Sequence, residues 1–121
     1  MLRRAERYAA ECGSFALSTI TVMEIVKGLH KERREDQIRR FLDGCTSVEL
    51  LTLDLNSAEL AGRIYGDLER LGQTIGRLDP MIAALALQHR LVLVSGNLVH
   101  FRRIQELGYA LKLDNWRLPA S

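Results

Sequence analysis

The segment Asp79–Asn97 constrains the fold more than any other part of the chain. Its run MIAALALQH would form a helix that is apolar nearly all round, and such a helix has to be buried. Asp79-Pro80 before it is typical of a helix start, with an N-cap carboxylate and proline at the first helical position. The following run Leu91–Val94 is apolar without alternation, as in a parallel strand covered on both faces. A buried helix that leads into a buried strand indicates an α/β fold.

The rest of the chain alternates in the same way. Strands are predicted at Phe15–Thr19, Val48–Leu53, Leu91–Val94 and Tyr109–Leu113. Helices are predicted at Leu2–Glu11, Thr21–His30, Glu35–Leu42, Asn56–Leu71, Met81–His89 and Phe101–Leu107. The predicted starts include two sequences of capping-box form, Thr21-x-x-Glu24 and Asn56-x-x-Glu59, while glycines 13, 44 and 72 are predicted to stop helices. Alternating strands and helices predict an α/β/α sandwich with a mostly parallel sheet.

Composition bounds the class of protein. With 121 residues, of which 47% are hydrophobic, the chain is expected to form one domain with a proper core. Neither a secretory apolar core nor an apolar run of roughly 20 residues is present, so we expect a cytoplasmic protein without a membrane partner. Cys12 and Cys45 lack metal-ligand spacing and are expected to be reduced. The net charge of +2 neither requires nor opposes a nucleic-acid partner.

Three polar side chains are expected just beyond strand ends or at helix starts. They are Glu24, Asp79 and Asn97. Ligands of open α/β sheets bind at the carboxyl ends of the strands. Carboxylate and amide oxygens are what a divalent metal ion needs there, so the pattern favours a metal site.

Each of these residues also has a purely structural interpretation. Glu24 can be the capping-box partner of Thr21, and Asp79 can be a simple N-cap. Asn97 can sit in a turn that uses the left-handed region of backbone space. The three histidines, His30, His89 and His100, have no ligand spacing, so zinc is not expected.

Basic residues surround the expected site. One cluster comprises Lys27, Lys31, Arg33, Arg34, Arg39 and Arg40. It can hold a nucleic-acid backbone, with salt-sensitive binding, or be a solvated helix face whose charge nearby acids offset. Arg77 and Arg102 flank the expected site and are the better candidates for phosphate contact. Ser95 is a further substrate candidate, or simply a turn hydroxyl.

Three segments, taken in their order and spacing, carry a resemblance to a known family. They are STITVMEIVKGL, LGQTIGRLDPMIAALALQHRLVLVSGNLVHF and LKLDNW. Over nearly its whole length the chain resembles PIN domains and, among them, the VapC ribonuclease toxins of type II toxin–antitoxin systems. The resemblance implies a Mg²⁺- or Mn²⁺-dependent endoribonuclease that cuts RNA, often tRNA or rRNA. It also implies a cognate VapB-type antitoxin, a homodimer and a location in the bacterial cytoplasm.

The resemblance assigns roles position by position. Glu24 matches the family's acid after the second strand, and Asp79 matches the acid that opens the buried helix. Asn97 falls where many members have a metal-binding aspartate, although asparagine also occurs there. Ser95 matches a common Thr or Ser at the strand tip, and His100 occupies a position that is often acidic in relatives. The metal site that the resemblance implies is therefore Glu24, Asp79 and Asn97.

The chain departs from the family at its N-terminus. Family members begin with a strand that ends in an Asp-Thr-Asn-type motif, whose aspartate is a principal metal ligand, and this sequence contains no such segment. In the family that strand lies between those matching Phe15–Thr19 and Leu91–Val94. We therefore expect residues 1–121 to form a single PIN-like domain, truncated at the N-terminus and without the first strand.

Two other functions remain open at the level of the sequence. One is a catalytically inactive PIN module that binds an antitoxin or another PIN subunit. The other is a nuclease that uses a different acid, such as Asp54 or Asp114.

Overall fold

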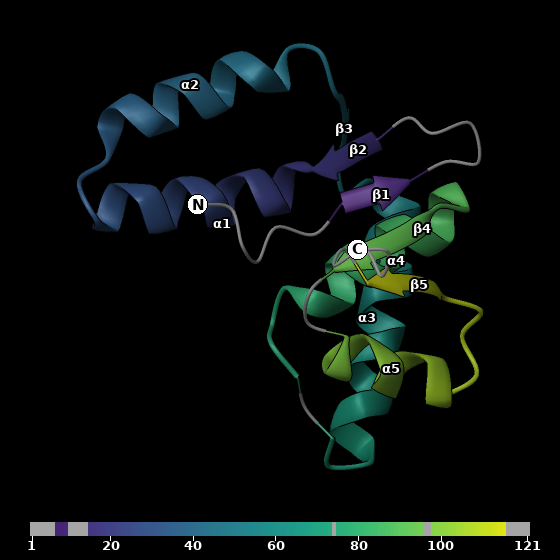
Figure 1. Cartoon of the computed structure of the whole chain (residues 1–121). Coiled ribbons are helices and arrows are strands. Elements are labelled where there is room, and N and C mark those ends of the chain that lie inside the picture. The colour runs from purple at the N-terminus through teal and green to yellow at the C-terminus, as the bar shows by residue number, and fades with distance from the viewer. Residues whose placement is uncertain (1–6, 10–14, 74, 96–97, 116–121) are drawn as a thin grey trace.

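The computed structural model describes residues 7–9, 15–73, 75–95 and 98–115. Its five strands are β1 (Arg7–Ala9), β2 (Phe15–Ser18), β3 (Glu49–Leu51), β4 (Val92–Ser95) and β5 (Lys112–Asn115). They form one sheet in the order β3-β2-β1-β4-β5 (Figure 1). The pairs β2–β3 and β4–β5 are parallel, whereas β1 is antiparallel to both of its neighbours. All strands except β1 therefore run in one direction, as expected of a mostly parallel sheet.

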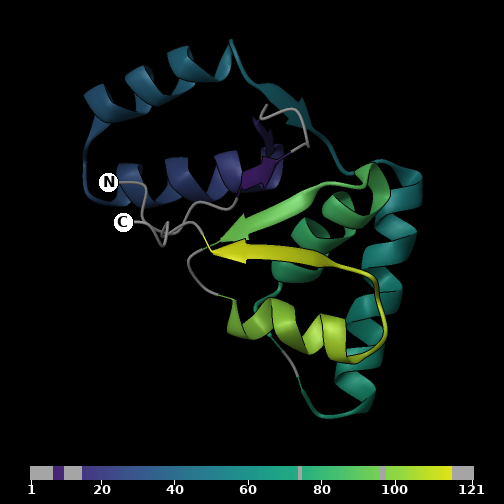
Figure 2. The same cartoon turned by 45° about the vertical axis from the view of Figure 1, so that its right-hand side comes forward.

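One or two helices separate each pair of successive strands from β2 to β5. The helices are α1 (Thr19–Lys31), α2 (Glu35–Cys45), α3 (Leu55–Arg70), α4 (Asp79–His89) and α5 (Val99–Glu106). Helices α1 and α2 form a hairpin that extends away from the part of the molecule containing α3, α4 and α5 (Figures 1 and 2). In the described part of the chain, no helix is long and apolar enough to cross a membrane.

Strand β1 corrects the prediction for the N-terminal region. A helix was predicted over Leu2–Glu11, but Arg7–Ala9 is a strand in which Tyr8 pairs with Ala16 of β2 and with Leu93 of β4. The flanking residues 1–6 and 10–14 lie outside the described residues, and the predicted helix stop at residue 13 lies among them. The physical reason is that β2 and β4 present backbone groups that need ladder partners, and this demand overrides a local preference for helix. The position in which the family's first strand was expected to be missing is thus filled, by a strand of opposite direction.

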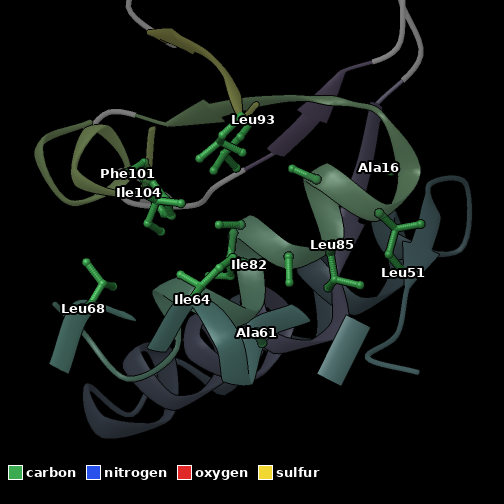
Figure 3. Close-up of a cluster of buried hydrophobic side chains, with 14 residues drawn as sticks. Ala16, Leu51, Ala61, Ile64, Leu68, Ile82, Leu85, Leu93, Phe101 and Ile104 are labelled. Carbon is green, nitrogen blue, oxygen red and sulfur yellow. The ribbon is translucent and has the colours of Figure 1, made fainter. Parts of the chain in front are cut away.

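Helix α4 lies at the centre of the core, as its composition predicts. From Ile82 to Ala86 every residue is at most 1% exposed. Around it pack buried side chains of α3, β4 and α5 (Figure 3), namely Ile64, Leu68, Leu93, Phe101 and Ile104. Burying each large side chain contributes about 1.5–3 kcal/mol, so this cluster fixes the position of α4 and of the residue that opens it.

The two predicted capping boxes are wrong. Helix α1 is capped by Ser18, whose backbone is extended and whose Oγ accepts a hydrogen bond from the Thr21 N–H at 2.9 Å. Helix α3 is capped by Asp54, which accepts from the Ser57 N–H at 2.8 Å, and not by Asn56. In both cases a suitable side chain lies earlier in the sequence, at an extended residue, and takes the cap. Thr21 is therefore inside α1.

Several other boundaries differ from the predictions. Helix α2 continues through Gly44 to Cys45, whereas Gly72 follows the end of α3 with a φ of 68°, as predicted. Strand β5 begins at Lys112 instead of at Tyr109. Tyr109 lies in the preceding loop, where its hydroxyl donates to Asp67 Oδ2 at 2.7 Å and ties the loop to α3.

Candidate active site

Asp79 is the first residue of α4, and its side chain does not cap that helix. The N-cap position is Leu78, which makes no side-chain cap bond, so the prediction of Asp79 as an N-cap is wrong. The carboxylate instead meets His100, with 2.8 Å between Asp79 Oδ2 and His100 Nδ1. The sequence interpretation that reduced Asp79 to a helix cap therefore fails, and the carboxylate is available for another role.

The Asp79–His100 contact joins the starts of two helices. Asp79 opens α4 and His100 is the second residue of α5, with β4 between them in the chain. Their side chains are 22% and 36% exposed, respectively. The turn before α4 fits closely against the carboxylate: the Asp79 N–H donates to the Gly76 carbonyl at 3.2 Å, and a Cβ on Gly76 would lie 3.3 Å from Asp79 Oδ2. The absence of a side chain at residue 76 leaves room for this carboxylate.

Electrostatics link Asp79 to Glu24. Burial raises the pKa of Asp79 above its usual range, and the negative charge of Glu24 raises it further, while the hydrogen bond from His100 only partly opposes these effects. Glu24 lies inside α1, which packs against α4. Its side chain is 40% exposed and lies 3.5 Å from Lys27 Nζ. Because Thr21 is not the N-cap of α1, Glu24 is not a capping-box partner. Its negative charge instead acts on the carboxyl group of Asp79.

For three of the other predicted site residues the structure gives a position in the fold, and it does not describe the fourth. Asn97 lies outside the described residues, so its role stays a prediction. Ser95 is fully buried at the end of β4. Arg77, in the loop before α4, and Arg102, on α5, are both exposed. Within the described residues the structure thus brings Asp79 together with His100 and with the charge of Glu24.

His100 is the site residue that spacing arguments missed. It lies 21 positions from Asp79, and no short motif joins two residues that far apart. The available signal was the resemblance, which placed His100 at a position often acidic in relatives. In this chain a histidine stands at that position, next to the Asp79 carboxylate.

The candidate donors, Glu24 and Asp79, are carboxylates, which are ligands that magnesium prefers. Among the residues described, there is no group of three or more His, Cys, Asp or Glu side chains that could hold a metal ion. Magnesium is commonly held by one or two carboxylates, with water and substrate phosphate oxygens completing its shell. Two carboxylates that repel each other, one of them largely buried, match that pattern.

The alternative acids serve other purposes or lie apart. Asp54 caps α3, and the hydrogen bonds from Ser57 lower the pKa of its carboxyl group, as expected of a cap. Asp114 is exposed on the edge strand β5. Both residues are exposed, whereas Asp79 is partly buried.

Comparisons with known proteins agree with this architecture. The PIN domain matches residues 2–107. The tRNA(fMet)-specific endonuclease VapC of Salmonella typhimurium is 31% identical over 112 residues, which cover 92% of this chain and 82% of that protein. Ribonuclease VapC2 of Haemophilus influenzae is 34% identical over 111 residues, covering 91% and 81%.

Solved structures show the same likeness. The DNA-bound VapBC structure from Salmonella typhimurium matches with a TM-score of 0.72 and 31% identity, over 84% of this chain and 74% of that one. VapBC-1 from nontypeable Haemophilus influenzae matches with a TM-score of 0.73 and 28% identity, over 85% and 75%. The chain belongs to the PIN-domain family. The predicted resemblance to VapC-type proteins and the predicted PIN-like α/β/α fold are thereby confirmed.

Proposed function

We propose that this protein is a VapC-type toxin, an endoribonuclease that hydrolyses phosphodiester bonds in RNA in a metal-dependent reaction. The observation that carries the proposal is the Asp79 carboxylate, which is 22% exposed at the start of α4 and lies 2.8 Å from His100 Nδ1. Its pKa is raised by burial and, to a smaller extent, by the charge of Glu24. A protein gains nothing in stability from an arrangement that disfavours the charged form of its own carboxylate. Such an arrangement is typical of functional sites. The PIN-domain relatives are named as ribonucleases or endonucleases, which supports the same reaction.

The proposed metal ion is Mg²⁺ or Mn²⁺. Glu24 and Asp79 would hold it, and Asn97 would contribute a neutral oxygen as a third ligand. Such an ion, when bound, lowers the pKa of a water molecule and stabilises charge on a phosphate. The chain itself contributes two things. It holds the Asp79 carboxylate at the start of α4 through the contact with His100 of α5, and it keeps that carboxylate partly out of water.

The proposed substrate is RNA, with tRNA or rRNA as the expected targets. Two relatives are named as tRNA(fMet)-specific endonucleases, which favours tRNA as the first substrate to test. Arg77 and Arg102 are exposed before α4 and on α5, the two helices that carry the acid–histidine pair, so they are suited to phosphate contact. Ser95, buried at the end of β4, is proposed to shape the strand tip, where the substrate would bind.

The proposed partner is a VapB-type antitoxin. The similar solved structures include VapBC complexes, two of them bound to DNA, and this supports an antitoxin for a chain with the same fold. We further propose that residues 1–121 act as one domain, that the protein forms a homodimer and that it works in the cytoplasm.

A second function is favoured by β1. This strand occupies the place of the family's first strand but runs in the opposite direction. In the described residues the site has two carboxylates and no group of three metal ligands. A PIN module of this kind could bind an antitoxin or another PIN subunit without cleaving RNA.

One experiment separates the two functions. The chain is incubated with total tRNA and rRNA, with and without Mg²⁺ or Mn²⁺, beside Asp79→Asn and the control Asp36→Asn on the exposed face of α2. The nuclease proposal predicts metal-dependent cleavage that Asp79→Asn abolishes and Asp36→Asn retains. If the folded wild-type chain does not cleave RNA, the nuclease proposal fails and the binding module becomes the leading function.

A further inference from the structure

We propose that His100 is a positioning residue of the metal site, which holds the Asp79 carboxylate in the orientation that a cation requires. This inference rests on the proposed function, because it concerns the same site. It goes beyond the family pattern, since the resemblance places an acid at this position more often than a histidine. The carrying observation is the distance of 2.8 Å between His100 Nδ1 and Asp79 Oδ2.

Both partners are fixed by the core. Asp79 precedes Pro80 and Ile82, which is 1% exposed, and His100 precedes Phe101, also 1% exposed. Helices α4 and α5 pack against each other, so the backbone on each side of the contact is anchored. A hydrogen bond between two anchored residues selects one orientation of the carboxylate out of those that a free side chain would sample.

The hydrogen bond with His100 gives the two oxygens of the Asp79 carboxylate different roles. When Asp79 is ionised, as a metal ligand has to be, its carboxylate only accepts hydrogen bonds, so His100 Nδ1 then carries the proton and donates to Oδ2. In this role Oδ2 faces His100, and Oδ1 is the oxygen that would face the cation. Histidine at this position thus orients the ligand without adding a third negative charge beside Asp79 and Glu24.

Mn²⁺ binding tests this role without reference to catalysis. We would titrate the full chain with Mn²⁺ and measure the free ion by electron paramagnetic resonance. The variants are His100→Ala, which removes the donor, and His100→Asn, whose side-chain amide keeps a donor near the position of Nδ1. The matched control is His89→Ala, because His89 is exposed at the far end of α4.

The expected result is a loss of Mn²⁺ affinity of about tenfold or more in His100→Ala, the size usual for a partner that orients a metal ligand. His100→Asn should recover most of that loss, and His89→Ala should bind like the wild type. Rescue by asparagine is a result that a merely structural histidine would not give. If His100→Ala does not fold, His100→Leu, which also lacks a donor but fills more of the space, replaces it in the comparison.

Two outcomes overturn the inference alone: His100→Ala binds Mn²⁺ as tightly as the wild type, or His100→Asn is as weak as His100→Ala. In both cases the wild type binds Mn²⁺ and Asp79→Asn does not, so the metal site itself stands. If the wild type does not bind Mn²⁺, or Asp79→Asn binds it unchanged, the proposed metal site fails and the role of His100 fails with it.

Discussion

The two carboxylates of the site belong to regions of very different construction. Asp79 opens a helix in which six residues are buried, and it is held by His100. Glu24 lies on α1, where only Thr21 and Leu29 are buried, and its charged neighbour is the exposed Lys27. Asp79 is thus placed by a packed core, whereas Glu24 is placed by a hairpin that extends from it (Figure 1). The contrast teaches that Asp79, one half of the proposed site, is preorganised by packing, whereas Glu24, the other half, has more freedom to adjust.

The largest expected effect tests the packing contrast directly. Leu85→Ala in α4 should lower the free energy of unfolding by about 2–5 kcal/mol, because it leaves a cavity at a position that is 0% exposed. Leu42→Ala in α2 should cost about 0.5 kcal/mol or less, because Leu42 is 43% exposed. Urea denaturation measures both. Equal losses in the free energy of unfolding would show that the α1–α2 hairpin is packed as tightly as the core around α4.

The second prediction concerns the charge on Asp79. Without metal, Asp79→Asn should leave the melting temperature unchanged or raise it, since burial and Glu24 disfavour the ionised carboxylate at neutral pH. Mn²⁺ at 100 times its Kd should stabilise the wild type by about 2.7 kcal/mol and the variant far less. Thermal unfolding monitored by circular dichroism, with and without Mn²⁺, gives all four values. A metal-free variant that melts well below the wild type would contradict the assignment.

A third test addresses the connection between the sheet and the hairpin. Ser18→Ala removes the oxygen that accepts the Thr21 N–H and that also donates to Thr21 Oγ1, and it should cost about 1–2 kcal/mol. Ser47→Ala is the control, because the Ser47 hydroxyl is exposed and donates only to the Gly44 carbonyl, at 3.1 Å. Its expected effect is within about 0.5 kcal/mol. Comparable losses in the two variants, measured by urea denaturation, would refute the capping role of Ser18.

The smallest effect is expected at the loop that follows α5. Tyr109→Phe removes the hydrogen bond to Asp67, which is the largest reason that the pKa of Asp67 is lowered in the folded protein. A lowered pKa in the folded state means that the ionised carboxylate adds stability above the unfolded pKa of about 3.9, and that this stability is lost as the pH falls through the folded pKa. The wild type should therefore be slightly more stable than Tyr109→Phe at pH 7. The difference should shrink below about pH 4, in urea denaturation carried out as a pH series. A difference that does not change with pH would mean that the hydroxyl acts without the charge of Asp67.

Much of the fold follows from local patterns. The apolar run before His89 predicts a buried helix, and residues 82–86 are buried. The unbroken apolar run around Leu93 predicts a covered strand, and Gly72 marks the end of α3. These features depend on periodicity and on local backbone chemistry, which a sequence states directly. The site roles of Glu24 and Asp79 stay predictions, whereas the alternative interpretations of these residues as capping partner and cap are wrong.

What the sequence determined by itself is the order of elements, the central helix α4 and the two acids around which a site could form. What only the tertiary structure decided is the strand at Arg7–Ala9 and the pairing of Asp79 with His100. Both depend on partners distant in the chain: β1 exists because β2 and β4 offer it backbone groups on both sides, and His100 matters because α5 brings it to the start of α4. Local propensity is worth a few tenths of a kcal/mol per residue, about 0.7 at most for ordinary residues, and such demands from packing and hydrogen bonding outweigh it.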